Sequence, residues 1–176
     1  MRILRTILWL SIAMQAGAAT LEKLSLEEMI QKSTAIVRGR VIGLRTVARG
    51  PVIYTLHQVQ VAEQWKGPAV SQIEVAVPGG AMNGLRQTFS GAPNLREDAE
   101  YVLFLWTGRN GLTQVIGLSQ GKFELLKTGK ENETLERSAV TERMLDSTGR
   151  LVEDTPLRMS LKQLNERIRL SLAGRK

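Results

Sequence analysis

The chain has 176 residues, no cysteine and one histidine, and its formal net charge is +7. A single domain of this size can bury a hydrophobic core without disulfides or a structural metal. The composition excludes zinc sites of the Cys/His type, cysteine nucleophiles and any Ser-His-Asp arrangement that needs a second histidine. The sequence therefore predicts no cofactor, no metal site and no catalytic residue.

The positive charge is concentrated at the two ends of the chain. Two arginines lie within the first five residues, and residues 158–176 contain six basic side chains and one acidic one. Residues 19–157 are consequently balanced in charge. A groove that follows nucleic-acid phosphates needs a basic surface, so we expect no nucleic-acid partner.

Residues 1–18 have the pattern of a secretory signal peptide. Two arginines precede an apolar run at residues 7–14, and small residues at 16–18 form a cleavage site. A membrane span needs about 20 apolar residues, and this run is shorter. We therefore expect cleavage after Ala18, no transmembrane span, and a secreted or periplasmic protein.

Two helices are predicted, one on each side of the main domain. Ser25 and Glu28 form a capping box at the start of the first, residues 24–32. Ser160 and Gln163 form a second box before a basic amphipathic helix. Its apolar face is narrow and lacks aromatic residues, so we favour packing on the domain over contact with an anionic membrane surface.

The chain between the helices is predicted to be mostly β-structure. Alternating apolar residues and turn signals predict strands at residues 35–44, 52–65, 73–77, 101–106, 112–118 and 122–126, with a further short strand possible at 85–89. The run at 101–106 is continuously apolar, which is typical of a central strand buried on both faces. Gly39 and Gly43 indicate a sharply coiled strand, as a barrel requires where it bends. Residues 127–158 are polar and predict an exposed hairpin or a mobile linker.

The order of these motifs resembles the netrin-like module. The first helix leads into S-T-A-I-V-R-G-R-V, the second strand ends in W-K-G-P, and I-E-V-A-V-P and E-x-Y-V-L-F-L come later. The set covers roughly residues 24–123 and is similar to the OB-type barrel of tissue inhibitors of metalloproteinases and complement C-terminal domains. It is also similar to a group of secreted bacterial proteins. The resemblance implies a small antiparallel OB-type (netrin-like) barrel over residues 19–126, then the segment 127–158 and a basic helix and tail at 159–176.

The resemblance does not extend to the chemistry of the inhibitors. Those proteins bind the protease zinc through an N-terminal cysteine that disulfides hold in place, and this chain has no cysteine. We therefore expect residues 19–22 to be unpinned, so that ordering them on a target costs entropy. Inhibitory activity is kept only as a remote alternative. The resemblance does imply that residues 78–83 correspond in position to a contact loop of the inhibitors.

The loop at residues 78–93 is the main candidate for a binding site. Its glycines would let the backbone approach a partner closely, and long loops inside a compact domain are often functional. The alternative is that the glycines only serve turns and that Met82 packs back onto the barrel. The candidate binding residues are Pro78, Gly79, Gly80, Met82, Asn83 and Leu85.

Other polar candidates have ordinary interpretations. His57 is expected to be an exposed or hydrogen-bonded strand residue. Glu97, Asp98 and Glu100 precede the most apolar strand, where solvated charges act as gatekeepers against aggregation. These carboxylates lack the spacing of a calcium loop, and an acid/base pair for sugar hydrolysis is only a remote option.

Two tryptophans end predicted strands. Trp65 and Trp106 could stack on bases or sugars, but aromatic residues make up only 5% of the chain. We expect Trp65 to fill the core or the barrel mouth.

Together these features predict a non-enzymatic binding module that recognises another exported protein through the 78–93 loop and the barrel rim. An envelope-associated structural protein, held to an anionic surface by the basic C-terminal helix, is the alternative. A hydrolytic enzyme has no constellation of residues to support it.

Overall fold

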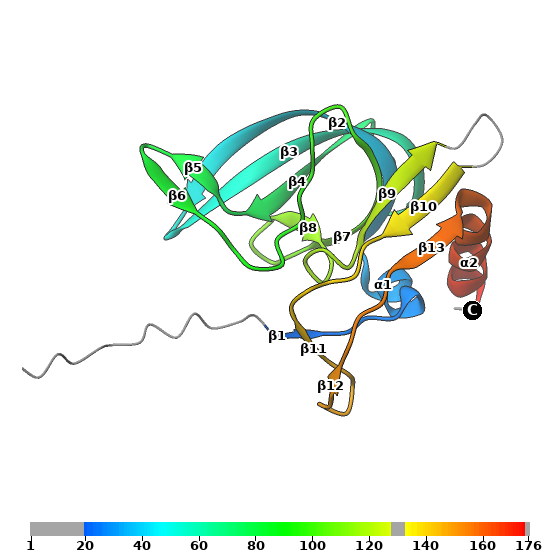
Figure 1. Cartoon of the computed structure of the whole chain (residues 1–176). Helices are drawn as coiled ribbons and strands as arrows, with labels where there is room; N and C mark the ends of the chain where they lie inside the picture. Colours follow the sequence, from blue (N-terminus) through cyan, green and yellow to red (C-terminus); the bar gives the residue numbers. More distant parts are fainter. Residues whose placement is uncertain (1–19, 128–132, 175–176) are drawn as a thin grey trace, which may run out of the picture.

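The computed structural model describes residues 20–127 and 133–174, and the predicted signal peptide at 1–18 lies outside them. Strands dominate the fold, with one helix near each end of the described chain (Figure 1). The elements are β1 (Thr20–Glu22), α1 (Leu26–Lys32), β2 (Ala35–Arg49), β3 (Val52–Lys66), β4 (Gln72–Pro78), β5 (Gly80–Met82), β6 (Leu85–Gln87), β7 (Glu100–Thr107), β8 (Thr113–Val115), β9 (Lys122–Lys127), β10 (Glu133–Arg137), β11 (Arg143–Leu145), β12 (Leu151–Val152), β13 (Leu157–Ser160) and α2 (Leu161–Ala173).

The main sheet has eight strands, and all its pairings are antiparallel. Its order is β13-β10-β9-β7-β2-β3-β4, and β8 pairs with β7 off this path. The predicted mostly-β class is therefore confirmed. β8 lies beside β4, yet no ladder joins these two strands, and the sheet is not closed into a barrel.

The predicted bend of β2 coincides with irregular pairing to β3. The register shifts between Arg38 and Gly39 and again between Val41 and Gly43. At Gly39 an added Cβ would lie 2.4 Å from the carbonyl oxygen of Gln60, so only glycine allows β3 to approach this closely. These irregularities increase the local twist and let a long two-stranded ribbon curl.

The strand β7 is the centre of the core, as predicted. Every residue from Tyr101 to Leu105 is buried. Val102 and Phe104 belong to one hydrophobic cluster, and the alternate side chains of β7 belong to another on the opposite face of the sheet. Phe104 also packs against Phe123 of β9, with ring centroids 5.5 Å apart.

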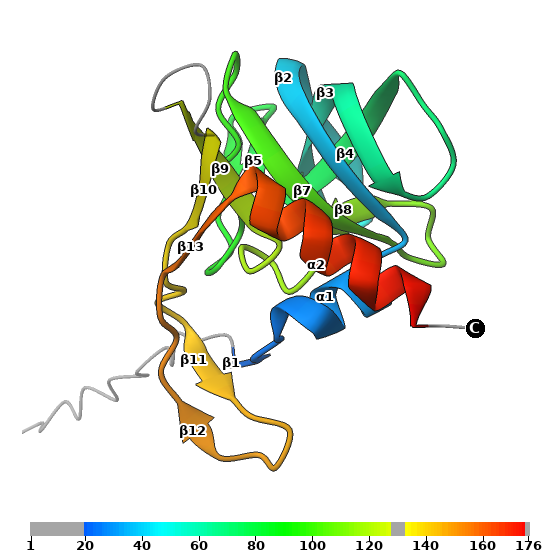
Figure 2. The ribbon, with the colours of Figure 1, turned by 90° about the vertical axis from the view of Figure 1, so that its right-hand side faces the viewer.

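Both helices lie against the same face of the sheet, where α2 runs beside α1 (Figure 2). Each begins with its predicted capping box, at Ser25 and at Ser160. Leu164 and Ile168 of α2 are fully buried in the cluster that contains Phe104. The prediction that the C-terminal helix packs on the domain is therefore confirmed. No helix of the described residues is long and apolar enough to cross a membrane.

The polar segment after β9 contains four strands. β10 and β13 continue the main sheet, while β11 and β12 join β1 in a small second sheet. The antiparallel pair β11–β12 fits the hairpin alternative of the prediction. Buried side chains such as Leu135 and Met144 pack the segment against the rest of the fold. Residues 128–132 lie outside the described part of the chain.

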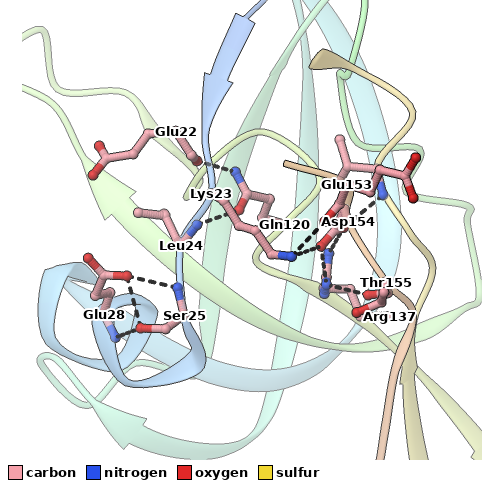
Figure 3. Close-up of polar contacts among 11 residues, drawn as sticks. Glu22, Lys23, Leu24, Ser25, Glu28, Gln120, Arg137, Glu153, Asp154 and Thr155 are labelled. Carbon is pink, nitrogen blue, oxygen red and sulfur yellow. Dashed lines mark hydrogen bonds and ion pairs between the residues drawn. The ribbon is translucent and has the colours of Figure 1, made fainter. Parts of the chain in front are cut away.

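The N-terminal segment is held firmly, contrary to the sequence-based expectation. β1 pairs in parallel with β11, and the buried side chain of Gln120 bonds both neighbours of Lys23 (Figure 3). Its Nε2 donates to the Glu22 carbonyl at 2.9 Å and its Oε1 accepts from the Leu24 N–H at 2.9 Å. Hydrogen bonds therefore replace the missing disulfides here.

A buried ion pair supports this attachment. Asp154, whose side chain is 1% exposed, accepts a bidentate pair of hydrogen bonds from Arg137 (Figure 3). Burial opposes ionisation, but the bonds from Arg137 and the Val140 N–H outweigh it and hold the pKa of Asp154 below its usual value. Lys23 Nζ lies 3.7 Å from the same carboxylate and donates to the Glu153 carbonyl.

Candidate functional site

The predicted binding loop at 78–93 contains a β-hairpin rather than irregular chain. β5 and β6 pair antiparallel, and Asn83 and Gly84 form the turn between them. Both have positive φ angles, 50° and 77°, which is the geometry that favours Asn-Gly in tight hairpin turns. The sequence-based strand at 85–89 corresponds to β6.

The hairpin is fastened to the end of the long β2–β3 ribbon. The side chain of Gln87 accepts from the Ile53 N–H at 2.7 Å and donates to the Pro51 carbonyl at 2.8 Å. Gly79 N–H donates to the Ile53 carbonyl, and Thr55 Oγ1 donates to the Gly79 carbonyl. These bonds involve both ends of the hairpin, so it is a supported element and not a free loop.

Gly80 serves packing against this ribbon. A Cβ there would lie 2.7 Å from Thr55 Oγ1, and its φ of 141° is strained for other residues. Gly79 is buried. Gly80 therefore allows the hairpin to approach β3 closely, and the role of the two glycines toward a partner stays a prediction.

A hollow of about 380 Å³ lies between β3 and the chain that returns from the hairpin. Pro78, Gly79 and Gly80 line it. The other predicted binding residues are placed on the hairpin itself: Met82 is half-buried and Asn83 is exposed. Leu85 is 69% exposed.

Two large apolar side chains at the hollow are also exposed to solvent. Leu44 is 50% exposed and Phe89 is 41% exposed, and both line the hollow. Neither residue was among the predicted binding residues. Leu44 lies opposite His57 in the β2–β3 pair. Placing Leu44 at this site from the sequence would have required the register of these two strands.

His57 forms part of the hollow's wall, and its expected exposure was wrong. The residue is 5% exposed, and its Nδ1 has no hydrogen-bond partner among the described residues. Burial lowers the pKa of the imidazole, so the ring is neutral near neutral pH. The sequence did contain a signal for this burial. Residues two apart in a strand face the same side, and Val59, two residues after His57, is buried.

The acidic residues that were expected to act as gatekeepers lie just before β7 and at its first position, Glu100. Glu100 is mostly buried and accepts a 2.6 Å hydrogen bond from Arg38 Nε, so it is not a solvated gatekeeper. Arg38 also pairs with Glu63 and Glu133. Within residues 20–127 and 133–174, no group of three or more His, Asp or Glu side chains could hold a metal ion.

The tryptophans have different environments. Trp65 is partly buried against the hydrophobic cluster beneath the helices, in agreement with the predicted packing role. Trp106 is 46% exposed at the end of β7. They do not combine into one stacking surface, because Trp65 packs against the cluster and only Trp106 is exposed.

Comparison with known proteins adds no relative: no family model matches the sequence, and no curated protein matches it. The site is therefore interpreted from its geometry alone. It offers a supported hairpin, a hollow with apolar and uncharged polar walls, and exposed leucine and phenylalanine side chains beside it.

Proposed function

We propose that the chain is a non-enzymatic binding protein that recognises another exported protein through the β5–β6 hairpin and the adjacent hollow. The observation that carries the proposal is the combination of exposed Leu44, Leu85 and Phe89 with a hollow at one end of the molecule. Single exposed apolar residues are ordinary on protein surfaces, whereas apolar residues gathered beside a concave site mark interaction surfaces.

The anchoring of the hairpin supports this proposal. Gln87, Thr55 and Ile53 hold the hairpin before any partner arrives. A surface that is already ordered loses less conformational entropy on binding than a flexible loop does. The hydrogen bonds around Gln87 therefore favour recognition by a preformed site.

The proposal includes two predictions from the sequence. The compartment follows from the signal-like residues 1–18, and the OB-type (netrin-like) architecture follows from the order of motifs between residues 24 and 123. The remote inhibitor-like alternative receives no additional support from the hairpin.

The envelope-associated alternative has less support than the binding-protein proposal. The apolar side chains Leu164 and Ile168 are buried in the core and cannot enter a lipid surface without unfolding. Arg167 pairs with Glu27, and Arg169 pairs with Glu166, which reduces the positive charge that α2 presents.

Site-specific cross-linking tests the proposal. A photoreactive amino acid replaces Leu85 in one variant and Leu151 of β12 in a second, because Leu151 is similarly exposed at 62%. Illumination in the exported fraction of the source cells should yield a discrete protein adduct from position 85 and none from position 151. An added Phe89→Asp substitution should remove the adduct.

Equal adducts from both positions, or an adduct at position 85 that survives Phe89→Asp, would contradict the proposal. The free energy of unfolding of Leu85→Asp and Leu151→Asp serves as the control. Substitutions at exposed positions usually change it by less than about 0.5 kcal/mol.

A further inference from the structure

We infer that the partner segment recognised at this site is an acidic peptide segment with a large apolar side chain beside the carboxylate. This inference rests on the proposed function and adds the chemistry of the partner. The surface concerned is the two-hairpin end, which comprises residues 41–62 of the β2–β3 ribbon and residues 75–96 of β4, the β5–β6 hairpin and the chain after it.

The two-hairpin end has no acidic side chain of its own. Residues 41–62 and 75–96 include no aspartate or glutamate, and their charged residues are Arg45, Arg49, Arg86 and Arg96. The rest of the described chain mixes both signs of charge. This distribution is hidden in the overall composition, because residues 19–157 are balanced as a whole.

Carboxylates from neighbouring segments neutralise part of this charge. Glu74 lies 2.7 Å from Arg45, and Glu124 lies 3.6 Å from Arg96. Glu142 also reaches this end, where Ser90 donates a hydrogen bond to it.

Two arginines are left without such a partner. Arg49 and Arg86 are exposed, and neither forms an ion pair within the described part of the chain. Their guanidinium groups are therefore available to a carboxylate from outside. Arginine is well suited to this task because its planar fork can bind both oxygens of a carboxylate.

The fold brings these two arginines to the same end of the molecule. Gln87 follows Arg86 directly and donates to the Pro51 carbonyl, and Pro51 belongs to the turn that follows Arg49. Figure 1 shows the β5–β6 hairpin beside the end of the β2–β3 ribbon. Leu85 and Arg86 are consecutive residues of β6, so their side chains lie on opposite faces of the hairpin.

The hollow suits the apolar part of such a partner. Its walls include Leu44, Phe89 and Leu95, and its polar groups come from uncharged side chains such as Thr55 and Asn94. No arginine lines the hollow itself, but Arg86 directly precedes Gln87, which does. A large apolar side chain can enter the hollow while a carboxylate further along the same segment reaches Arg86. Apolar anchors in a pocket with charges at the rim are the usual arrangement of peptide and protein interfaces.

A protein segment fits this surface better than an anionic bilayer does. Basic segments that bind anionic lipids usually have about four to eight lysines or arginines, and only Arg49 and Arg86 are unpaired here. Interfacial binding also favours protruding tryptophan or phenylalanine, whereas Phe89 lines a hollow.

The test is selection of random 12-residue peptides displayed on phage against the full chain. We expect the enriched peptides to carry Asp or Glu within two positions of Leu, Phe or Tyr. Synthetic copies should bind about tenfold or more weakly to the Arg49→Glu/Arg86→Glu variant, and raising NaCl from about 0.05 to about 0.5 M should weaken binding to the unmodified protein.

The matched control is Lys162→Glu/Arg169→Glu, which makes the same change of charge at two exposed basic residues of α2, and Figure 1 shows this helix on the opposite side of the molecule from the β5–β6 hairpin. Its affinity should stay within about twofold of the unmodified protein, because those charges do not meet the peptide. Thermal unfolding of both double variants shows whether the fold is intact.

Three other results would contradict the inference. Enriched peptides that lack acidic residues but lose binding in Leu85→Asp would overturn the inference and leave the proposed function standing. Failure to enrich any peptide also overturns the inference. If phosphatidylglycerol vesicles then bind the protein, and Arg49→Glu/Arg86→Glu abolishes that binding, the occupant is a bilayer and the proposed function fails as well.

Discussion

His57 is the only histidine of the chain, and it lies buried in β3 with no partner for Nδ1 within residues 20–127 and 133–174. A neutral imidazole tolerates this position, whereas an imidazolium would need solvent or an acceptor. The residue therefore makes the hollow sensitive to acid although it presents no charge near neutral pH. This sensitivity can be measured without knowing the partner.

We predict that acid destabilises the fold through His57 before the carboxylates titrate. The pKa of His57 is lowered in the folded protein, while the unfolded chain has an ordinary value of about 6.5. As the pH falls below about 6.5, the imidazole becomes protonated in the unfolded state but stays neutral in the folded state. The free energy of unfolding therefore decreases.

Urea unfolding between about pH 7.5 and pH 5 measures this effect. His57→Gln should remove most of the pH dependence in that window, since the variant has no imidazole to protonate. A decrease of equal size in the unmodified protein and in His57→Gln would assign the effect to other groups.

At the scale of elements, the curl of the β2–β3 ribbon depends on one glycine more than on the other. Gly39 leaves no room for a side chain beside Gln60, whereas a Cβ at Gly43 would meet nothing within 4 Å. The two positions are four residues apart in the same strand, and each lies at a shift of register. They therefore form a matched pair for testing what the bend requires.

We predict that Gly39→Ala lowers the free energy of unfolding by about 1–3 kcal/mol, because the added carbon forces β3 away. Gly43→Ala should change it by less than about 1 kcal/mol and can even stabilise the protein by restricting the unfolded chain. Equilibrium denaturation of both variants gives the comparison. Equal losses at the two positions would mean that the close contact at Gln60 is not what constrains the ribbon.

The same elements show what the sequence could predict. The capping boxes at Ser25 and Ser160 and the run from Tyr101 to Leu105 are local signals, and they located α1, α2 and β7 correctly. β10 and β13 were missed because Leu135 and Met159 are buried by partners distant in sequence. A segment with few apolar residues has a polar average composition, which hides the positions that are buried.

The candidate site was predicted only in location. Pro78 and the two glycines after it were expected at a binding surface, and they do line the hollow. Nothing in the local pattern indicated that Gln87 would bond across to Ile53 and Pro51, because that contact depends on how the two hairpins meet. The arginine pairing at the two-hairpin end could not be read from spacing for the same reason.

At the scale of the whole molecule, α2 is a structural cover for the sheet. Leu164 and Ile168 complete the cluster around Phe104, while Leu170 on the other side of the helix is 59% exposed. The helix thus covers one face of the sheet (Figure 2). The β5–β6 hairpin lies at the other side of the molecule (Figure 1), and the candidate hollow is beside it.

We predict that Leu164→Ala lowers the free energy of unfolding by about 2–5 kcal/mol, as is usual when a buried leucine is truncated. Leu170→Ala should change it by less than about 0.5 kcal/mol. Thermal or urea unfolding measures both. If Leu164→Ala proves as mild as Leu170→Ala, α2 does not belong to the cooperative core.

The attachment of β1 has a consequence for the order in which the chain can fold. Lys23 donates to the carbonyl of Glu153, 130 residues further along the sequence, and β1 pairs with β11. A chain that emerges from its N-terminus presents Thr20–Glu22 early, but the docking surface for this segment emerges only once residues 143–153 have been made. The first strand of the fold is therefore among the last to be secured, and until then it remains accessible to chaperones and to proteases.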